Sequence, residues 1–383
     1  MMVPSLPPST TLPRGSRPGI ATVWQGIQPG LQPASPSPTP PSPSPPPCIA
    51  DDEAHATPNP VRTRRRSEET PSRTGPWADL CTLVSKDVPP FIDSHCHLDF
   101  LYERMGSFTT VKDLLNMFDG TIPPTLLGCI PNFIDPRFFT KFGDKRWNWM
   151  MGIIQDELVL GCAYGCHPKK VGQANELFWK ALSWLVEHKK ESKIVAIGEC
   201  GVDLTSSNDN SLEVQLEVFR RQVKIAVDAN LTIVIHCREG RGRDPEDDVL
   251  NVLREHPNHR IHRHCFTRGE LVAKKWIKTL HNVTFGFTPM LLNGSASMLE
   301  AAKSIPMDRI ILETDAPYFK PAAFGPKYSS KHSHMGAAIA VAHRIAELKK
   351  LEVNEVAESA LEVESRTKEY VNSAPPLSQD TPV

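Results

Sequence analysis

Short β-rich runs, each followed by a helical stretch, recur eight times between residues 89 and 372. Several runs, such as Ile194–Ile197 and Leu231–Ile235, are nearly continuous apolar segments, which is typical of parallel strands buried on both faces. Eight strand–helix units in about 285 residues predict an α/β fold, a (β/α)8 TIM-type barrel of ordinary size. The expected strands are Phe91–Ser94, Thr125–Phe133, Leu158–Cys166, Lys193–Glu199, Leu231–His236, Arg260–Phe266, Asn282–Phe287 and Arg309–Asp315.

Amphipathic segments lie between these runs. The clearest is Ser211–Ala229, where apolar residues recur at helical spacing and Ser211 is a suitable N-cap. A final helical pair is expected at His334–Leu348 and Val353–Val371.

The two ends of the chain have a different composition. Residues 1–88 hold more than half of the 36 prolines, with serine and threonine between them and few aromatic residues, which predicts a disordered tail. The tail contains a basic run, Arg62–Arg66, before Ser67. This run is either a nuclear-import or nucleic-acid patch or an ordinary solvated charge run. Protein partners of the Pro-rich tail are a further expectation, and residues 373–383 are expected to form a loose C-terminal tail.

Bulk composition limits the classes of function. The chain has 43 Lys+Arg and 44 Asp+Glu, so no global charge draws it to nucleic acid or to a membrane surface. Nine cysteines without a Cys-x-x-Cys pair argue against a disulfide framework and a zinc knuckle, and indicate a reducing compartment. No apolar run has the length of a membrane span, and no signal pattern begins the chain. We therefore expect an intracellular protein of the nucleus or cytoplasm, or both, with no membrane contact.

Metal-capable side chains stand at the ends of the expected strands, where the βα loops of such barrels carry the chemistry. Two of these side chains, His95 and His97, lie two residues apart, a spacing that puts both rings on one face of a strand. Burying so many ionisable groups in one barrel mouth would be very costly unless cations paired them. The six candidate metal ligands are His95, His97, Glu199, His236, His264 and Asp315.

Residues beside these candidates fit the same arrangement. Alternation predicts that four cysteines next to candidate ligands point away from the site and pack as small apolar side chains. Asp93 and Glu313 lie two residues before candidate ligands, so we expect their carboxylates to orient those ligands. The four cysteines are Cys96, Cys200, Cys237 and Cys265.

Together these motifs resemble the TatD family of metal-dependent nucleases, which belongs to the amidohydrolase-like barrels, and the tail-plus-domain layout resembles animal proteins with a TatD DNase domain. The resemblance covers about residues 90–372, with the motifs in the family's order. It implies a barrel at 89–372, nucleic acid as substrate and the six residues above as ligands. The motifs are Ser94–Asp99, Ile197–Asp203, Val234–Glu239, His264–Phe266 and Leu312–Tyr318.

Four segments depart from the family pattern and leave substrate preference open. One is Ser365–Thr367, which stands where the family's closing helix usually has an Asn near its end. Gly165–Lys169 keeps only the first histidine of the family's Gly-x-His-Pro-His turn. The loop Glu239–Asp244 is longer than usual, and Lys331–His334 replaces an Asn-x-Pro stretch.

Six ligands suit two divalent ions, Mg, Mn or Zn, in a two-metal hydrolytic site. We expect one ion on His95, His97 and Asp315, a second on His236 and His264, and Glu199 between them. Catalysis would then rest on Glu199 and on Asp315, the latter as general base towards the attacking water.

Basic residues near the expected barrel mouth suit a phosphate backbone, although a scatter of surface bases would look the same. Arg238 is expected to reach the scissile phosphate, and His167 either binds substrate or caps its turn. The other bases are Lys169, Lys170, Arg241, Arg243, Arg263 and Arg268.

Two alternatives to a nuclease stay open. One is an amide, lactone or cyclic-urea hydrolase on the same barrel, although Glu199 stands where many such enzymes have a carboxylated lysine. The other is a non-catalytic scaffold. The sequence leaves DNA versus RNA, end versus internal cleavage, and the oligomeric state undecided.

Overall fold

The computed structural model of the chain describes residues 88–106, 108–118, 122–240, 242–321 and 330–368. The predicted N-terminal tail with its basic run and the C-terminal tail lie outside the described residues, apart from Val88. None of the described helices has the length and apolar character that crossing a membrane requires.

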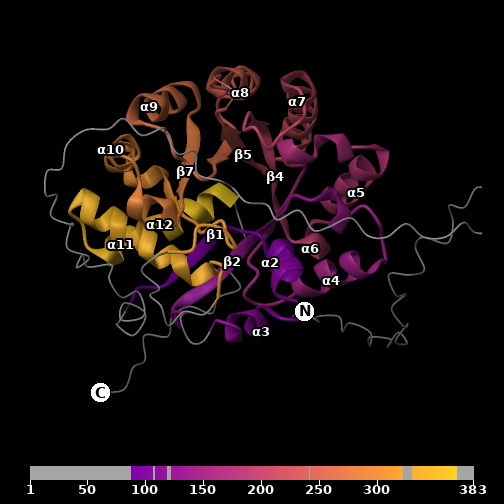
Figure 1. Cartoon of the computed structure of the whole chain (residues 1–383), viewed down its shortest axis with the longest axis horizontal. Coiled ribbons are helices and arrows are strands. Elements are labelled where there is room, and N and C mark those ends of the chain that lie inside the picture. The colour runs from indigo at the N-terminus through magenta and orange to yellow at the C-terminus, as the bar shows by residue number, and fades with distance from the viewer. Residues whose placement is uncertain (1–87, 107, 119–121, 241, 322–329, 369–383) are drawn as a thin grey trace, which may run out of the picture. The chain divides into compact units, whose positions relative to one another are not determined.

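Eight parallel strands form one sheet in chain order, which confirms the predicted (β/α)8 barrel (Figure 1). The sheet closes where the end of the first strand meets the chain after the last one. There the His97 amide donates to the Ala316 carbonyl at 2.7 Å, and the Asp315 amide to the His95 carbonyl at 2.9 Å. The strands are β1 (Phe91–Cys96), β2 (Leu126–Phe133), β3 (Cys162–Tyr164), β4 (Ile194–Asp203), β5 (Thr232–Arg238), β6 (Arg260–Arg263), β7 (Asn282–Phe287) and β8 (Ile310–Leu312).

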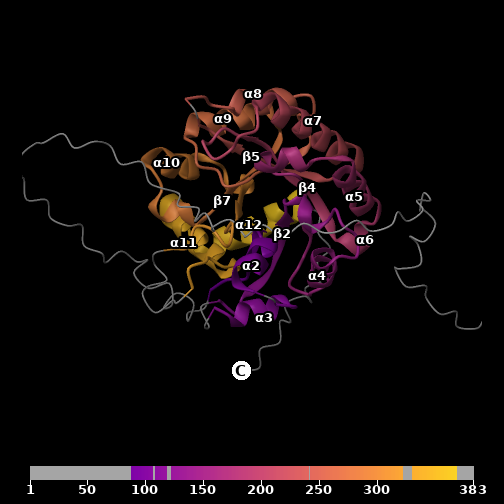
Figure 2. The ribbon, with the colours of Figure 1, turned by 45° about the vertical axis from the view of Figure 1, so that its right-hand side comes forward.

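Helices surround the strands, as the two ribbon views show (Figures 1 and 2). The longest, α7 (Leu212–Ala229), begins as predicted, because the Ser211 hydroxyl accepts a hydrogen bond from the Val214 amide. The other helices are α2 (Leu98–Met105), α3 (Val111–Asn116), α4 (Lys145–Ile153), α5 (Glu176–Glu187), α6 (Lys189–Ser192), α8 (Glu246–Leu253), α9 (Glu270–Thr279), α10 (Ala296–Ser304), α11 (Ala338–Lys349) and α12 (Val353–Lys368).

Two strands run beyond their predicted ends. β4 and β5 stay paired as far as Asp203 and Arg238, so Glu199 and His236 lie within this ladder and not at its edge. The register of β4 shifts between Ile197 and Cys200. Gly201 follows at φ +137°, and a Cβ there would lie 2.0 Å from the His236 carbonyl oxygen, so glycine permits this close approach. By contrast, β3 and β8 are three residues each, shorter than predicted.

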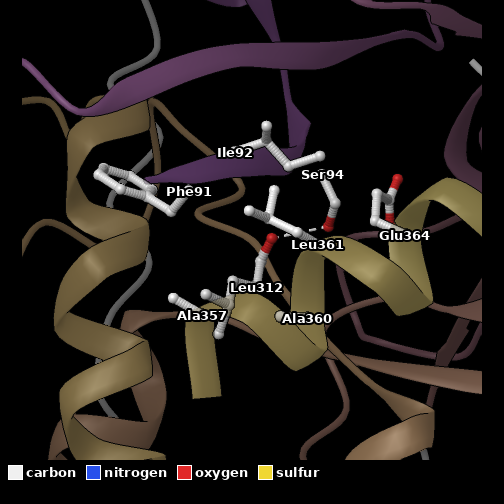
Figure 3. Close-up of a pocket in the computed structure, with 8 residues that line it drawn as sticks. All are labelled: Phe91, Ile92, Ser94, Leu312, Ala357, Ala360, Leu361 and Glu364. Carbon is white, nitrogen blue, oxygen red and sulfur yellow. Dashed lines mark hydrogen bonds between the residues drawn. The ribbon is translucent and has the colours of Figure 1, made fainter. Parts of the chain in front are cut away.

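The last helix, α12, packs against β1 and β8 and carries a buried ion pair. Lys368 and Glu364 lie one turn apart with Nζ and Oε1 3.1 Å from each other, and Lys368 Nζ also donates to the Ser94 carbonyl at 2.6 Å. A cavity of about 10 Å³, at the lower limit for holding one water, lies between α12, Ser94 and Leu312 (Figure 3). The pair thus ties the end of α12 to the strand that carries His95.

Candidate metal centre

The structure brings all six predicted ligands together. One group gathers around the first carboxylate oxygen of Glu199: Oε1 lies 3.1 Å from Nε2 of His95 and 3.1 Å from Nε2 of His97. Asp315 completes this group, with Oδ1 2.9 Å from His97 Nε2 and 3.7 Å from His95 Nε2. One ligand atom from each of these four residues lies within 4.8 Å of the others.

A second group gathers around the other oxygen of Glu199. Its Oε2 lies 3.0 Å from Nδ1 of His236 and 3.4 Å from Nε2 of His264. The three ligand atoms again fall within 4.8 Å of one another. Glu199 therefore presents one oxygen to each group, an arrangement that suits a carboxylate shared between two cations.

Burial and charge together set the protonation of this cluster. Burial opposes ionisation of Glu199, but the interactions with His264 and His95 hold the pKa of its carboxyl well below the usual value. Burial likewise opposes the charged form of His97, yet contacts with Asp315 and Glu199 raise the pKa of that ring. Ionised carboxylates that are buried need positive charge close to them. Imidazole nitrogens and carboxylate oxygens together form a set of ligand atoms that binds divalent cations.

Asp315 reaches the cluster through an unusual backbone conformation. Its φ of +56° lies in the left-handed region, which Asp and Asn adopt more readily than other side chains. Residues held in this region often mark functional sites, because the surrounding structure must support the strain.

Glu313 lies beside a candidate ligand, where an orienting carboxylate was expected, whereas Asp93 contacts the backbone. Glu313 Oε1 lies 3.2 Å from Nδ1 of His264, the ring nitrogen opposite the one that faces Glu199. Asp93 instead accepts from the amides of Thr314 and His95 and from the Thr314 hydroxyl, so it holds the backbone on both sides of the barrel closure.

His262, which was not among the predicted site residues, is a fully buried ring that lies beneath the cluster. Its Nε2 lies 2.7 Å from Glu313 Oε2, and burial lowers the pKa of the ring to about 3. The indication was present, because His262 precedes His264 by two residues within the predicted strand Arg260–Phe266, and residues at that spacing share one face of a strand. The Glu313–His262 pair forms the floor of the site.

Gly286 on β7 leaves the space that this floor occupies. A Cβ there would lie 2.1 Å from Glu313 Oε2 and 2.6 Å from His262 Nε2. We expect Gly286→Ala to displace both side chains, lower the free energy of unfolding by about 1–3 kcal/mol and weaken metal binding, as urea unfolding and metal titration would measure. Gly152→Ala in α4 is the control, because its added Cβ would meet nothing within 4 Å. Equal stability of the two variants would contradict the claim that Gly286 leaves necessary space for Glu313 and His262.

Three of the four cysteines pack as predicted, and the prediction for the fourth is wrong. Cys96, Cys200 and Cys237 belong to the apolar core. Cys265 has a φ of +44°, which ends the strand alternation, and its Sγ lies close to ligand atoms of His264 and Asp315. This thiol therefore faces the site.

Arg238 and His167, the predicted substrate contacts, both border the cluster. Arg238 donates to Cys265 Sγ at 2.8 Å and to Thr267 Oγ1 at 3.0 Å. Burial opposes its charge, but Cys265, Asp315 and Glu199 raise the pKa of the guanidinium. His167 places Nε2 3.3 Å from Nδ1 of His236, and burial lowers the pKa of His167 to about 3.

The other predicted bases do not form one free cationic rim. Arg263 is 1% exposed and pairs with Glu246 at 3.1 Å, so its expected place at the mouth is wrong. Most of the others face acidic partners. Lys170 pairs with Asp135, Arg243 with Asp248, Arg268 with Glu239 and Asp244, and Lys169 donates to Ser207, while Arg241 lies outside the described residues.

A second missed residue, Asp203, ends β4 inside the site. Its Oδ2 lies 3.1 Å from Nε2 of His236. The residue stands in the Ile197–Asp203 motif, but only the extension of β4 beyond Glu199 brings its side chain to His236.

Comparisons with known proteins agree with this geometry. The family model described as TatD related DNase matches residues 92–367. The human 3'-5' RNA nuclease TATDN2 is 35% identical over 294 residues, which are 75% of this chain and 36% of the human protein. The 3'-5' ssDNA/RNA exonuclease TatD of Escherichia coli is 30% identical over 191 residues, 48% of this chain and 67% of the bacterial protein.

A solved structure shows the same fold. The TatD homologue YjjV from Escherichia coli superposes with a TM-score of 0.59 at 20% identity, covering 73% of this chain and 98% of its own. Because the family model spans most of the chain and the human relative aligns with three quarters of it, the chain belongs to the TatD-related DNase family.

Proposed function

We propose that this protein is a metal-dependent nuclease that hydrolyses phosphodiester bonds of nucleic acid. The observation that carries the proposal is Glu199, whose two oxygens face two separate groups of metal-capable side chains. Relatives named as 3'-5' nucleases of RNA or single-stranded DNA support a 3'-5' direction on single strands. The chain spans only 36% of the human relative, so that protein's activity supports the proposal without deciding it.

Two divalent ions, Mg, Mn or Zn, would be held by these groups. His95, His97 and Asp315 would hold one ion, His236 and His264 the other, and Glu199 both. The ions supply Lewis acidity, which acidifies a water and offsets negative charge on a phosphate. Nine-tenths or more of each ligand side chain is buried, so the electrostatic effect of such ions is screened little by solvent.

The protein's own groups would place the water and the phosphate. Asp315 would accept a proton from the attacking water, because it is a carboxylate at the mouth of the site and, at 7% exposed, the most accessible acid of the cluster. His167 Nδ1 accepts a hydrogen bond from the Lys169 amide at 3.0 Å, so its proton resides on Nε2, which points into the site. That N–H would donate to a phosphate oxygen.

Arg238 would grip the phosphate that is cut. We expect Arg238→Ala to lower kcat/KM on an oligonucleotide by about 10–100-fold, because a charged hydrogen-bond donor to phosphate is lost. Metal affinity should stay unchanged, as titration of the metal-free protein would check. Arg254→Ala, at an exposed arginine after α8, is the matched control. Unchanged kcat/KM in Arg238→Ala would refute this role.

Digestion of labelled nucleic acid tests the proposed function directly. Metal-free protein, reconstituted with Mg, Mn or Zn in turn, would be given 5'-labelled single- and double-stranded DNA and RNA. We expect a ladder that shortens from the 3' end and requires added metal. Hydrolysis of simple lactones or amides, with every nucleic acid left intact, would instead favour the amidohydrolase alternative.

We further propose that residues 89–372 form the catalytic domain, which the family match over 92–367 supports. An intracellular location, in nucleus or cytoplasm or both, is proposed from cysteine usage. Partners of the Pro-rich tail are proposed from its composition alone.

A further inference from the structure

Asp203 contacts a candidate metal ligand from the side opposite the metal centre. It is 2% exposed, and its Oδ2 lies 3.1 Å from Nε2 of His236. The other nitrogen of that ring, Nδ1, lies 3.0 Å from Glu199 Oε2. His236 can therefore ligate an ion through Nδ1 only if the proton of the neutral ring resides on Nε2, facing Asp203.

Neighbouring hydrogen bonds place the proton on that nitrogen. The Lys169 amide donates to Nδ1 of His167, so this nitrogen is unprotonated and the His167 proton resides on Nε2. His167 Nε2 lies 3.3 Å from Nδ1 of His236 and can donate to it while that nitrogen holds no ion. On the other side of the His236 ring, the Asp203 carboxylate can only accept a hydrogen bond, so Nε2 carries a proton and donates to Oδ2.

Asp203 is itself held firmly. Its Oδ1 accepts from the Thr205 amide at 2.9 Å and from the Thr205 hydroxyl. Its backbone amide donates to Gln215 Oε1 at 2.8 Å, and its carbonyl accepts from Asn208 Nδ2 at 2.8 Å. Only Oδ2 is directed at His236, and Lys169 Nζ lies 3.9 Å from that oxygen.

We propose that Asp203 is a positioning residue: it fixes the tautomer and the orientation of His236 so that Nδ1 is available to a metal ion. This inference rests on the proposed assignment of His236 as a ligand. A carboxylate behind a metal-ligating histidine typically contributes about 10–100-fold to metal affinity.

Because of these contacts, we expect Asp203→Asn to weaken metal binding more than Asp203→Ala does. In Asp203→Asn the amide oxygen must occupy the Oδ1 position, because Thr205 presents two donors there. The amide nitrogen then faces Nε2 of His236 as a donor, which drives the ring proton to Nδ1 and blocks the ligating lone pair. Asp203→Ala removes the acceptor but leaves the ring free to adopt either tautomer.

Metal titration of metal-free protein with Mn²⁺ or Zn²⁺ alone, together with a count of bound ions, tests the proposal. We expect Asp203→Asn to lose about 10–100-fold in affinity for one ion, and Asp203→Ala to lose less. Asp209→Asn, an exposed aspartate six residues further on, is the matched control and should bind as the wild type does. Wild-type affinity in Asp203→Asn would overturn the proposal.

A rival role for Asp203 would give the opposite order. His167, Asp203 and His236 also form a group that could hold an ion of its own. In that case Asp203→Ala would bind at least as weakly as Asp203→Asn and would lose one ion from the count, which overturns the positioning role.

His236→Ala separates failure of this inference from failure of the metal assignment. Loss of one ion in His236→Ala with wild-type affinity in Asp203→Asn would overturn the inference alone. Full ion content and affinity in His236→Ala would overturn both.

Discussion

Asp315→Asn is expected to lower the turnover number on nucleic acid by about 10²–10⁴-fold, the contribution typical of a general base. The change keeps the shape of the side chain but removes the negative charge that accepts the proton. Folding should be little affected, because asparagine tolerates the left-handed backbone that Asp315 adopts at φ +56°. Steady-state kinetics at saturating metal would measure the loss.

Thermal unfolding of the same variant provides the fold control, and Asp308→Asn provides the charge control. Asp308 is an exposed aspartate before β8, so its replacement should leave turnover unchanged. Wild-type turnover in Asp315→Asn would remove this residue from the chemistry, and unfolding of the variant at low temperature would mean that its role is structural.

Lys368→Met is expected to lower the free energy of unfolding by about 3–5 kcal/mol, because it leaves the Glu364 carboxylate buried without its cation. Both side chains are at most 1% exposed, so water cannot replace the lost contact. The variant also loses the hydrogen bond from Lys368 Nζ to the Ser94 carbonyl, one residue before His95. Urea unfolding monitored by circular dichroism would measure the change.

The double variant Lys368→Met with Glu364→Leu shows whether the loss comes from the unpaired charge. Replacing both partners of a buried pair with apolar side chains is often neutral, so most of the lost stability should return. A double variant as unstable as Lys368→Met would place the effect in packing at the cavity between α12 and Ser94, and not in the charge.

The sequence predicted the barrel well because parallel strands are buried on both faces and read as apolar runs. β7 begins and ends at the predicted residues, Asn282 and Phe287. The ends of β4 and β5 were less predictable. The two strands are extended by pairing with each other, and no local sequence pattern marks how far that pairing continues. This extension is what brings Asp203 to His236.

At the site, the ligand candidates were predictable and their surroundings were only partly so. Strand alternation gave the inward direction of His95 and His97, and it held for Cys96, Cys200 and Cys237. It failed at Cys265, because a single residue at φ +44° reverses the direction of a side chain. Likewise, whether Arg263 reaches solvent or a buried Glu246 depends on tertiary packing.

Anomalous diffraction from crystals soaked in Mn²⁺ or Zn²⁺ tests the central claim most directly. We predict two ions, one on the Oε1 side of Glu199 with His95, His97 and Asp315, and one on the Oε2 side with His236 and His264. A single ion, or ions that leave Glu199 without a metal contact, would contradict the two-metal account.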